Sequence, residues 1–122
     1  MIFKVLIVDD DYINRHLLVS LLKKELYQIE TIESVDGEDA LLKCKEHSDL
    51  QLILLDIEMP NMDGSDFLRL YKKDEKTSQV PVIAISSNDL RKKEIISFGA
   101  NAFLQKPITE KKLIAAIREV QN

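Results

Sequence analysis

Three short apolar segments, widely spaced along the chain, constrain the fold most strongly. They are KVLIV (4–8), LQLILL (50–55) and VPVIAI (80–85). Each is too short for a typical helix and is flanked by polar or turn-forming residues, which favours a strand. Nearly continuous apolar runs are typical of strands covered on both faces, as in a parallel sheet. The stretches between the three segments are long enough for helices, so we expect strands and helices to alternate.

The rest of the chain completes this alternation. Apolar residues at helical spacing predict a first helix from about Asp11 to Leu26, with Asp10 or Asp11 as its N-cap. Two weaker strands are expected at 29–35 and 102–104. Four further helices are expected at 37–46, after Asp63–Gly64, at about 88–97 and at about 109–120. Short strands separated by helices pair in parallel through right-handed crossovers.

The fold class follows from where the most apolar strands must lie. Because the first, third and fourth strands are the most apolar, they belong in the centre of the sheet. The order 2-1-3-4-5 satisfies this, giving a doubly wound, flavodoxin-like α/β fold with five helices. With 122 residues, the chain is expected to be one domain spanning 1–122.

Composition excludes several classes of function. The net charge of -4 argues against nucleic acid as a direct ligand. No apolar run approaches the ~18 residues of a membrane span, and the N-terminus does not resemble a signal peptide. The single cysteine, Cys44, cannot form an internal disulfide and is expected to be a buried apolar residue. These features predict a cytoplasmic protein with no membrane or nucleic-acid contact.

Charge is uneven along the chain. Residues 1–64 contain 14 acids and 6 bases, whereas residues 65–122 contain 7 acids and 11 bases. This is either ordinary scatter over helix surfaces or an acidic site in the first half with a basic, partner-facing surface in the second. The runs Arg91–Lys93 and Lys111–Lys112 are interpreted as solvated helix faces or as docking positions. His16 and His47 are interpreted as surface residues, because neither follows a strand.

Polar residues follow the strands where each strand ends. In chain order they are Asp9, Asp10 and Asp11, then Asp56, then Ser86 and Ser87, then Lys106. The carboxyl ends of parallel strands meet at one edge of the sheet, where ligands bind in this class of fold. We therefore expect three of these carboxylates, a hydroxyl and an ammonium to converge there.

Clustered carboxylates repel one another unless a cation joins them, and all-oxygen sites suit Mg²⁺. A carboxylate can also act as a nucleophile and form an acyl phosphate, a reaction that needs mainly positioning and charge compensation. Asp56, a single acid between flanking groups, is the predicted acceptor. Asp9 and Asp10 are the predicted metal-holding residues.

The chain resembles the receiver domain of response regulators in two-component signalling. The resemblance rests on VLIVDDD (5–11), LLDIEMPNMDG (54–64), PVIAIS (81–86) and GANAFLQKP (99–107), in that order. It implies that Asp56 accepts a phosphoryl group and that Mg²⁺ is held by Asp9, Asp10, Asp56 and the backbone carbonyl of Glu58. It also implies that Ser86 and Lys106 bind the phosphoryl group.

The resemblance also implies how a signal would be read. Ser86 and Phe103 correspond to the family's switch residues, and Glu58 and Asn88 occupy positions expected to tune the lifetime of the acyl phosphate. The Lys106–Pro107 bond is expected to be cis. The predicted readout surface consists of the fourth helix, fifth strand and fifth helix. Serine replaces the frequent threonine, and phenylalanine replaces the frequent tyrosine.

The implied partners are a histidine kinase or a histidine phosphotransfer protein, with an unidentified downstream effector. The chain would then be a regulatory phosphoacceptor and not a turnover enzyme, undergoing only self-phosphorylation and self-dephosphorylation. A phosphorylation-dependent homodimer is left open. Because the chain stops soon after the last apolar helix face, we expect no effector domain within it; whether it stands alone or is part of a longer regulator is also open.

Two alternatives remain at this stage. Asp9-x-Asp11 after an apolar strand is similar to the nucleophile motif of haloacid dehalogenase phosphohydrolases, which would make Asp9 the nucleophile with Mg²⁺. This alternative leaves Asp56 without a role. A flavin- or nucleotide-binding module is the other alternative, but DDDYINR would place three anions where a ligand phosphate should lie.

Overall fold

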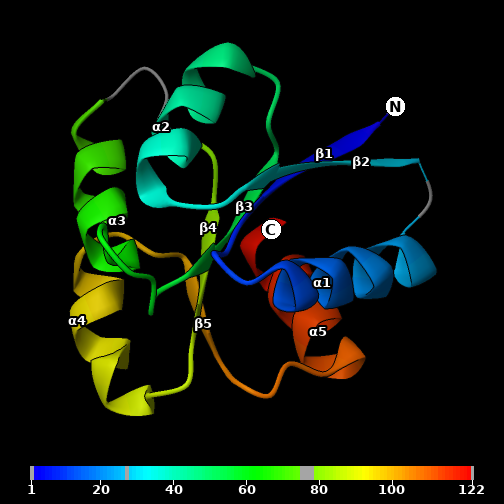
Figure 1. Ribbon diagram of the computed structural model, residues 1–122. Helices are drawn as coiled ribbons and strands as arrows, with labels where there is room; N and C mark the ends of the chain where they lie inside the picture. The colour runs from blue at the N-terminus through cyan, green and yellow to red at the C-terminus, as the bar shows by residue number, and fades with distance from the viewer. Residues whose placement is uncertain (1, 27, 75–78, 122) are drawn as a thin grey trace.

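The five strands form one parallel sheet in the order β2-β1-β3-β4-β5 (Figure 1), which confirms the predicted fold class. The computed structural model describes residues 2–26, 28–74 and 79–121. The strands are β1 (Phe3–Val8), β2 (Ile29–Ser34), β3 (Leu52–Asp56), β4 (Val82–Ser86) and β5 (Ala102–Gln105). The helices are α1 (Tyr12–Glu25), α2 (Gly37–Glu46), α3 (Gly64–Lys73), the short 3-10 helix η1 (Asp89–Arg91), α4 (Lys92–Ser97) and α5 (Glu110–Gln121).

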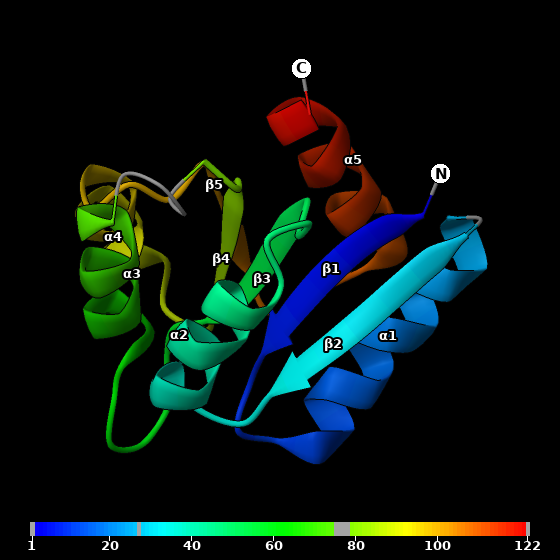
Figure 2. The same ribbon diagram turned by 90° about the horizontal axis from the view of Figure 1, so that it is seen from above.

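Helices cover both faces of the sheet. Figure 2 shows α1 and α5 on one face and α2, α3 and α4 on the other. The core is correspondingly divided in two. Leu18 and Leu22 of α1 pack with Leu113 and Ile117 of α5 on the first face, while Phe67 is among the residues that fill the second. Every residue of β3 and β4 is buried, as expected for strands covered on both faces.

The strand boundaries differ from the sequence-based prediction by one or two residues. β4 begins at Val82 because Pro81 has no N–H to donate, although the Pro81 carbonyl still accepts from Ile53 N at 3.0 Å. β3 extends to Asp56, which is therefore part of the strand itself. The acid is consequently held by sheet hydrogen bonding and not by a loop.

The fourth helical segment is the clearest difference from the prediction. Instead of one helix over about 88–97, the chain forms η1 and then α4, which is six residues long. The Asn88 side chain accepts a hydrogen bond from Leu90 N at 3.0 Å, which caps the tighter 3-10 turn. Ile95 is the one buried residue of α4, consistent with the poor apolar face seen in the sequence.

The first helix has more apolar surface than its core requires. Leu18 and Leu22 are buried, but Ile13 is 74% exposed and Leu17 is 49% exposed. Helical spacing therefore predicted the helix correctly without separating its buried residues from its exposed ones. Among the described residues, no helix has the length and apolar character needed to cross a bilayer.

Candidate functional site

The residues predicted from the strand ends do meet at one edge of the sheet. Asp9 follows β1, Asp56 ends β3 and Ser86 ends β4. The strand register aligns these ends, because Val8 pairs with Leu55 and Asp56 pairs with Ile85. Lys106 follows β5, and its backbone N donates to the Ser86 carbonyl at 2.9 Å.

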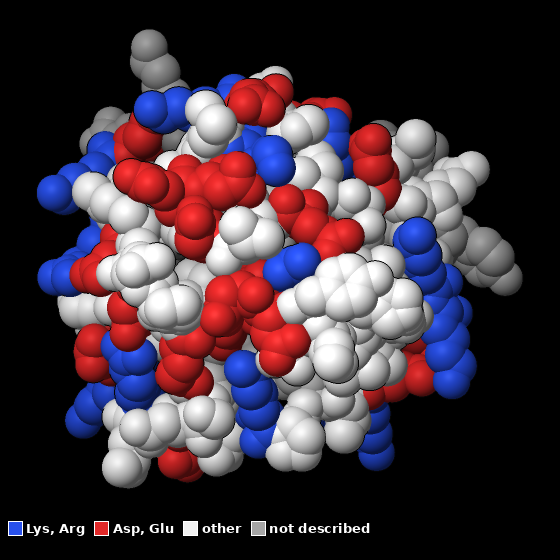
Figure 3. Space-filling model, in the orientation of Figure 1, with Lys and Arg blue, Asp and Glu red and all other residues white. Residues whose placement is uncertain are grey.

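Three carboxylates form what we call the carboxylate cluster: Asp9, Asp10 and Asp56. One oxygen of each lies within 4.8 Å of the others. Asp9 and Asp56 are only 2% and 3% exposed, whereas Asp10 faces solvent. Acidic side chains gather near the middle of the face seen in Figure 3. The site is therefore a buried acidic floor with one exposed carboxylate at its rim.

Burial and mutual repulsion make the cluster electrostatically unfavourable. Burial raises the pKa of Asp56 to about 7, and the charge of Asp9 adds to this rise. Burial also raises the pKa of Asp9 above its usual value, although the Asp11 N–H opposes the shift. The folded protein therefore holds Asp56 partly protonated near neutral pH unless a cation is added.

Lys106 compensates for only part of this charge. Its Nζ lies 3.1 Å from Asp56 Oδ1. Burial alone would lower the pKa of Lys106, but Asp56, Asp9 and Glu58 together raise it above its usual value, so the side chain stays an ammonium. Apart from this ion pair, the buried Asp56 Oδ1 has no hydrogen-bond partner among the described residues. Buried acceptors of this kind are uncommon and call for a partner.

The donor set fits a divalent cation. Hard carboxylate oxygens, one of them at the solvent-facing rim, match the preference of Mg²⁺ for a few protein oxygens and several waters. The specific observation that favours such an ion is the buried Asp56 oxygen, which has no partner beyond Lys106 among the described residues. That the backbone carbonyl of Glu58 is a further ligand of this ion stays a prediction.

Backbone contacts hold Asp9 in place. Its Oδ1 accepts from Asp11 N at 2.8 Å, and its carbonyl accepts from Arg15 Nη1 at 2.7 Å. Arg15 is itself buried and pairs with Glu33 at 3.0 Å, so it links α1 to the ends of β1 and β2. Asp11 accepts from Ile13 N and is the N-cap of α1. Sequence reasoning missed Arg15, because its contact with Asp9 is made to the backbone carbonyl and not to the carboxylate.

The loop after Asp56 is tightly folded. Gly64 N donates to the Ile57 carbonyl at 2.8 Å, so the start of α3 lies against the end of β3. A Cβ on Gly64 would lie 2.6 Å from the Asp56 carbonyl oxygen, too close for any side chain. Asp63 caps α3 by accepting from Ser65 N at 3.0 Å, and the helix begins at the Asp63–Gly64 pair after which the sequence predicted one.

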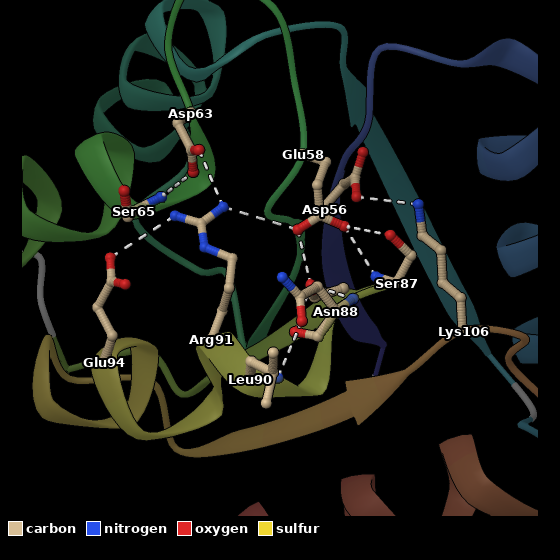
Figure 4. Close-up of polar contacts among 11 residues, drawn as sticks. Asp56, Glu58, Asp63, Ser65, Ser87, Asn88, Leu90, Arg91, Glu94 and Lys106 are labelled. Atoms are coloured by element: carbon tan, nitrogen blue, oxygen red, sulfur yellow. Dashed lines mark hydrogen bonds and ion pairs between the residues drawn. The ribbon is translucent and has the colours of Figure 1, made fainter.

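Glu58 uses its side chain in a way that the sequence did not reveal. Its Oε2 accepts from Ser86 Oγ at 2.6 Å. Its Oε1 accepts from Ser87 N at 2.8 Å and from Ser87 Oγ at 3.0 Å (Figure 4). Ser86 is fully buried and also accepts from Asn88 N at 3.0 Å. The hydroxyl predicted to bind a phosphoryl group is thus bound to a carboxylate of the same chain.

Arg91 completes this arrangement from η1. Its Nη1 lies 3.0 Å from Asp63 Oδ2 and 3.7 Å from Glu58 Oε2, and its Nη2 lies 3.6 Å from Glu94 Oε1. The sequence placed Arg91 in a solvated basic run, but the side chain is directed to the site (Figure 4). We call Glu58, Asp63, Ser86, Ser87 and Arg91 the Glu58 network.

The remaining predicted residues lie at the side of the sheet formed by β5. The Lys106–Pro107 bond is cis, as the resemblance implied. Phe103 is half-buried and lines a groove of about 500 Å³ between α4, β5 and α5.

Away from the site, Cys44 is buried as predicted, and burial raises the pKa of its thiol to about 12. His16 is exposed and His47 is half-buried, both away from the strand ends.

Comparisons with known proteins agree with this geometry. Residues 5–118 match the response regulator receiver domain family. The chain is 38% identical over 120 residues to the response regulator PleD of Caulobacter vibrioides, covering 96% of this chain and 26% of PleD. It is 34% identical over 116 residues to the polar-differentiation response regulator DivK of Brucella ovis, covering 93% and 92%.

A histidine kinase and a chemotaxis protein are also similar. The osmosensing histidine protein kinase SLN1 of Saccharomyces cerevisiae is 32% identical over 122 residues, which are 95% of this chain and 10% of the kinase. The structure of a CheX-CheY-BeF3-Mg²⁺ complex from Borrelia burgdorferi contains a chain with a TM-score of 0.87 and 31% identity, covering 98% of this chain and 90% of that chain.

The chain spans about a quarter of PleD and a tenth of SLN1, whereas it spans nearly all of DivK. In each case the matched segment covers between 93% and 96% of this chain. This chain therefore belongs to the family of response regulator receiver domains of two-component signalling.

Proposed function

We propose that this chain is a phosphorylation-operated switch in which Asp56 accepts a phosphoryl group from a partner's phosphohistidine. The observation that carries the proposal is the buried Asp56 oxygen that has the Lys106 ammonium as its ion-pair partner, no further hydrogen bond among the described residues, and two more carboxylates beside it. The relatives whose names describe response regulators support the same function. The similarity to a segment of the kinase SLN1 supports a histidine-based phosphodonor, from either a kinase or a phosphotransfer protein.

The proposed chemistry is a transfer between two nucleophiles. An Asp56 oxygen attacks the donor phosphorus, a P–O bond forms, the P–N bond breaks and its electron pair returns to the donor imidazole. Mg²⁺, held by Asp9, Asp10, Asp56 and the Glu58 carbonyl, would neutralise charge on the phosphoryl oxygens. Lys106 would pair with one phosphoryl oxygen and Ser86 would donate a hydrogen bond to another.

Asp56 is favoured over Asp9 as the nucleophile. Asp9 Oδ1 already accepts from the Asp11 N–H, and the Asp11 carboxylate is engaged in capping α1. A haloacid dehalogenase mechanism would need Asp11 as an acid and base, so this capping counts against it. Asp56 Oδ1 has the ammonium of Lys106 nearby and no competing hydrogen bond among the described residues.

The proposed output is a change on the surface made by α4, β5 and α5. Phe103 lines the groove there, and Ser86 lies at the end of the neighbouring strand β4. Movement of Ser86 toward a phosphoryl group would allow Phe103 to move further inward, which would change the groove presented to an effector or to a second copy of the chain. Glu58 and Asn88 would then set how long the acyl phosphate lasts.

The test is phosphorylation by a small acyl-phosphate donor with Mg²⁺, followed by intact mass. The proposal expects one added phosphoryl group in the native chain, none in Asp56→Asn, and one in the control Asp66→Asn, whose carboxylate is exposed on α3. Label that persists in Asp56→Asn would contradict it. So would steady hydrolysis of a phosphate ester that is lost in Asp9→Asn but retained in Asp56→Asn.

A further inference from the structure

The Glu58 carboxylate occupies a small anion-binding site. The site consists of the Ser86 hydroxyl, the Ser87 hydroxyl and the Ser87 backbone N–H, all within 3.0 Å of its oxygens. Hydrogen bonds from such donors to a charged acceptor are stronger than those between neutral groups. Both carboxylate oxygens are engaged, so the side chain is held in one orientation although it is 35% exposed.

Ser86 cannot serve two acceptors at once. A hydroxyl has a single proton, and Ser86 Oγ has two acceptors for it, Glu58 Oε2 at 2.6 Å and the more distant Asn88 carbonyl at 3.2 Å. The shorter contact, to a charged acceptor, is the stronger one, and Ser86 Oγ also accepts from Asn88 N. Ser86 directly follows Ile85, the residue paired in register with Asp56. A phosphoryl group on Asp56 would therefore need a hydroxyl that Glu58 already holds.

Charge also opposes keeping both anions in place. A phosphoryl group carries about -1.5 to -2 charge near neutral pH. Glu58 is two residues beyond Asp56, and its carboxylate is held by Ser86, at the end of the strand paired with that of Asp56, so an added anion on Asp56 would repel it. The nearest cation for a displaced Glu58 is Arg91, whose Nη1 is 3.7 Å away and which already holds Asp63 and Glu94.

We propose that the Glu58 side chain is an internal competitor for the phosphoryl group, holding Ser86 and Ser87 until phosphorylation of Asp56 displaces it toward Arg91. This rests on the function proposed above. Because Arg91 joins the loop after β3 to η1 and α4, displacement of Glu58 changes the contacts that fix α4. Glu58 is thus a positioning residue for the phosphoryl-binding hydroxyl, beyond any effect on acyl-phosphate lifetime.

The experiment measures binding of beryllium fluoride, a phosphoryl mimic, at saturating Mg²⁺, by following the backbone amide resonances of Ser86 and Ser87. Removing the competitor in Glu58→Ala should tighten binding about tenfold or more, since hydrogen bonds to a charged group no longer have to be broken. Glu58→Gln, which keeps a weaker acceptor of the same shape, should tighten it less. The control Glu94→Ala removes an Arg91 partner that does not contact Ser86, and its affinity should stay within about threefold of the native value.

A second cycle separates competition from simple relief of repulsion. If Glu58 competes for Ser86, most of the gain from Glu58→Ala should vanish in a Ser86→Ala background. The same gain with and without Ser86 would overturn the proposal, as would unchanged or weaker binding in Glu58→Ala. If the native chain binds no beryllium fluoride, both this inference and the proposed function fail; native binding without a Glu58 effect removes this inference alone.

Discussion

The carboxylate cluster and the Glu58 network lie side by side at the same edge of the sheet, yet they differ in how well their charges are compensated. In the cluster, Lys106 forms an ion pair with Asp56, and apart from this pair the buried Asp56 oxygen has no hydrogen-bond partner among the described residues. In the network, the Glu58 carboxylate accepts three hydrogen bonds, with a guanidinium nearby. The carboxylate cluster, whose charge is poorly compensated, indicates where a ligand binds. The Glu58 network, whose hydrogen bonds are complete, indicates which contacts must rearrange when the ligand binds.

The largest expected effect comes from removing Lys106, the cation beside the carboxylate cluster. Lys106→Met should slow phosphorylation by a small acyl-phosphate donor about 100-fold, because a positioned charge for the transferred group is lost. The initial rate of label incorporation, measured by intact mass at fixed Mg²⁺, checks this. Lys111→Met, which removes an exposed cation on α5, is the control. A rate for Lys106→Met equal to that of the control would show that the ammonium has no part in transfer.

Asp56→Asn should stabilise the metal-free protein. The pKa of Asp56 is raised from 3.8 to about 7 on folding, so the folded state is penalised as the pH rises above 3.8, and the penalty is complete above about 7. Removing the charge should raise the free energy of unfolding by about 2 kcal/mol at pH 8, after allowance for the lost Lys106 contact.

Urea unfolding in the presence of a chelator at pH 8 and pH 5 measures this effect. The gain should shrink at pH 5, where Asp56 is protonated in the folded native chain. Asp89→Asn, on the exposed surface of η1, should have little effect at either pH. Destabilisation by Asp56→Asn at pH 8 would mean that Lys106 compensates the buried charge fully. The carboxylate cluster and the Glu58 network would then not differ in charge compensation.

A smaller effect is expected from removing the guanidinium of the Glu58 network. Arg91→Gln removes a guanidinium shared by Asp63, Glu58 and Glu94, which should lower the free energy of unfolding by about 1 kcal/mol, since the pairs are partly solvated. Chemical denaturation at neutral pH, with Lys93→Gln as a matched exposed control on α4, provides the measurement. Equal stability of the two variants would mean that Arg91 is no more than a surface charge.

Sequence reasoning reached the carboxylate cluster because each member lies at the carboxyl end of a strand or directly after it. Once the strand order was predicted, the positions of Asp9, Asp56 and Lys106 along the edge followed from parallel pairing alone. The fold could be predicted from the three apolar segments because a strand buried on both faces has a nearly continuous apolar sequence. This pattern is visible in the sequence without knowledge of how the side chains pack.

The Glu58 network could not be reached in this way. Its contacts join residues 28 and 29 positions apart through side-chain direction, which strand order does not define. Arg91 had the appearance of a member of a basic surface run, and only the observed packing directs it to Asp63. The split of the fourth helix was missed for a related reason, because Asn88 caps a 3-10 turn that helical spacing does not reveal.

Calorimetric titration of Mg²⁺ at pH 8 tests the central claim most directly, that the carboxylate cluster is an incomplete site awaiting a cation. The native chain should bind one ion, and Asp9→Asn and Asp56→Asn should each weaken binding by at least about tenfold. Arg91→Gln, which disturbs only the Glu58 network, should stay within about threefold of the native affinity. Native affinity in Asp56→Asn, or no binding to the native chain, would contradict the account.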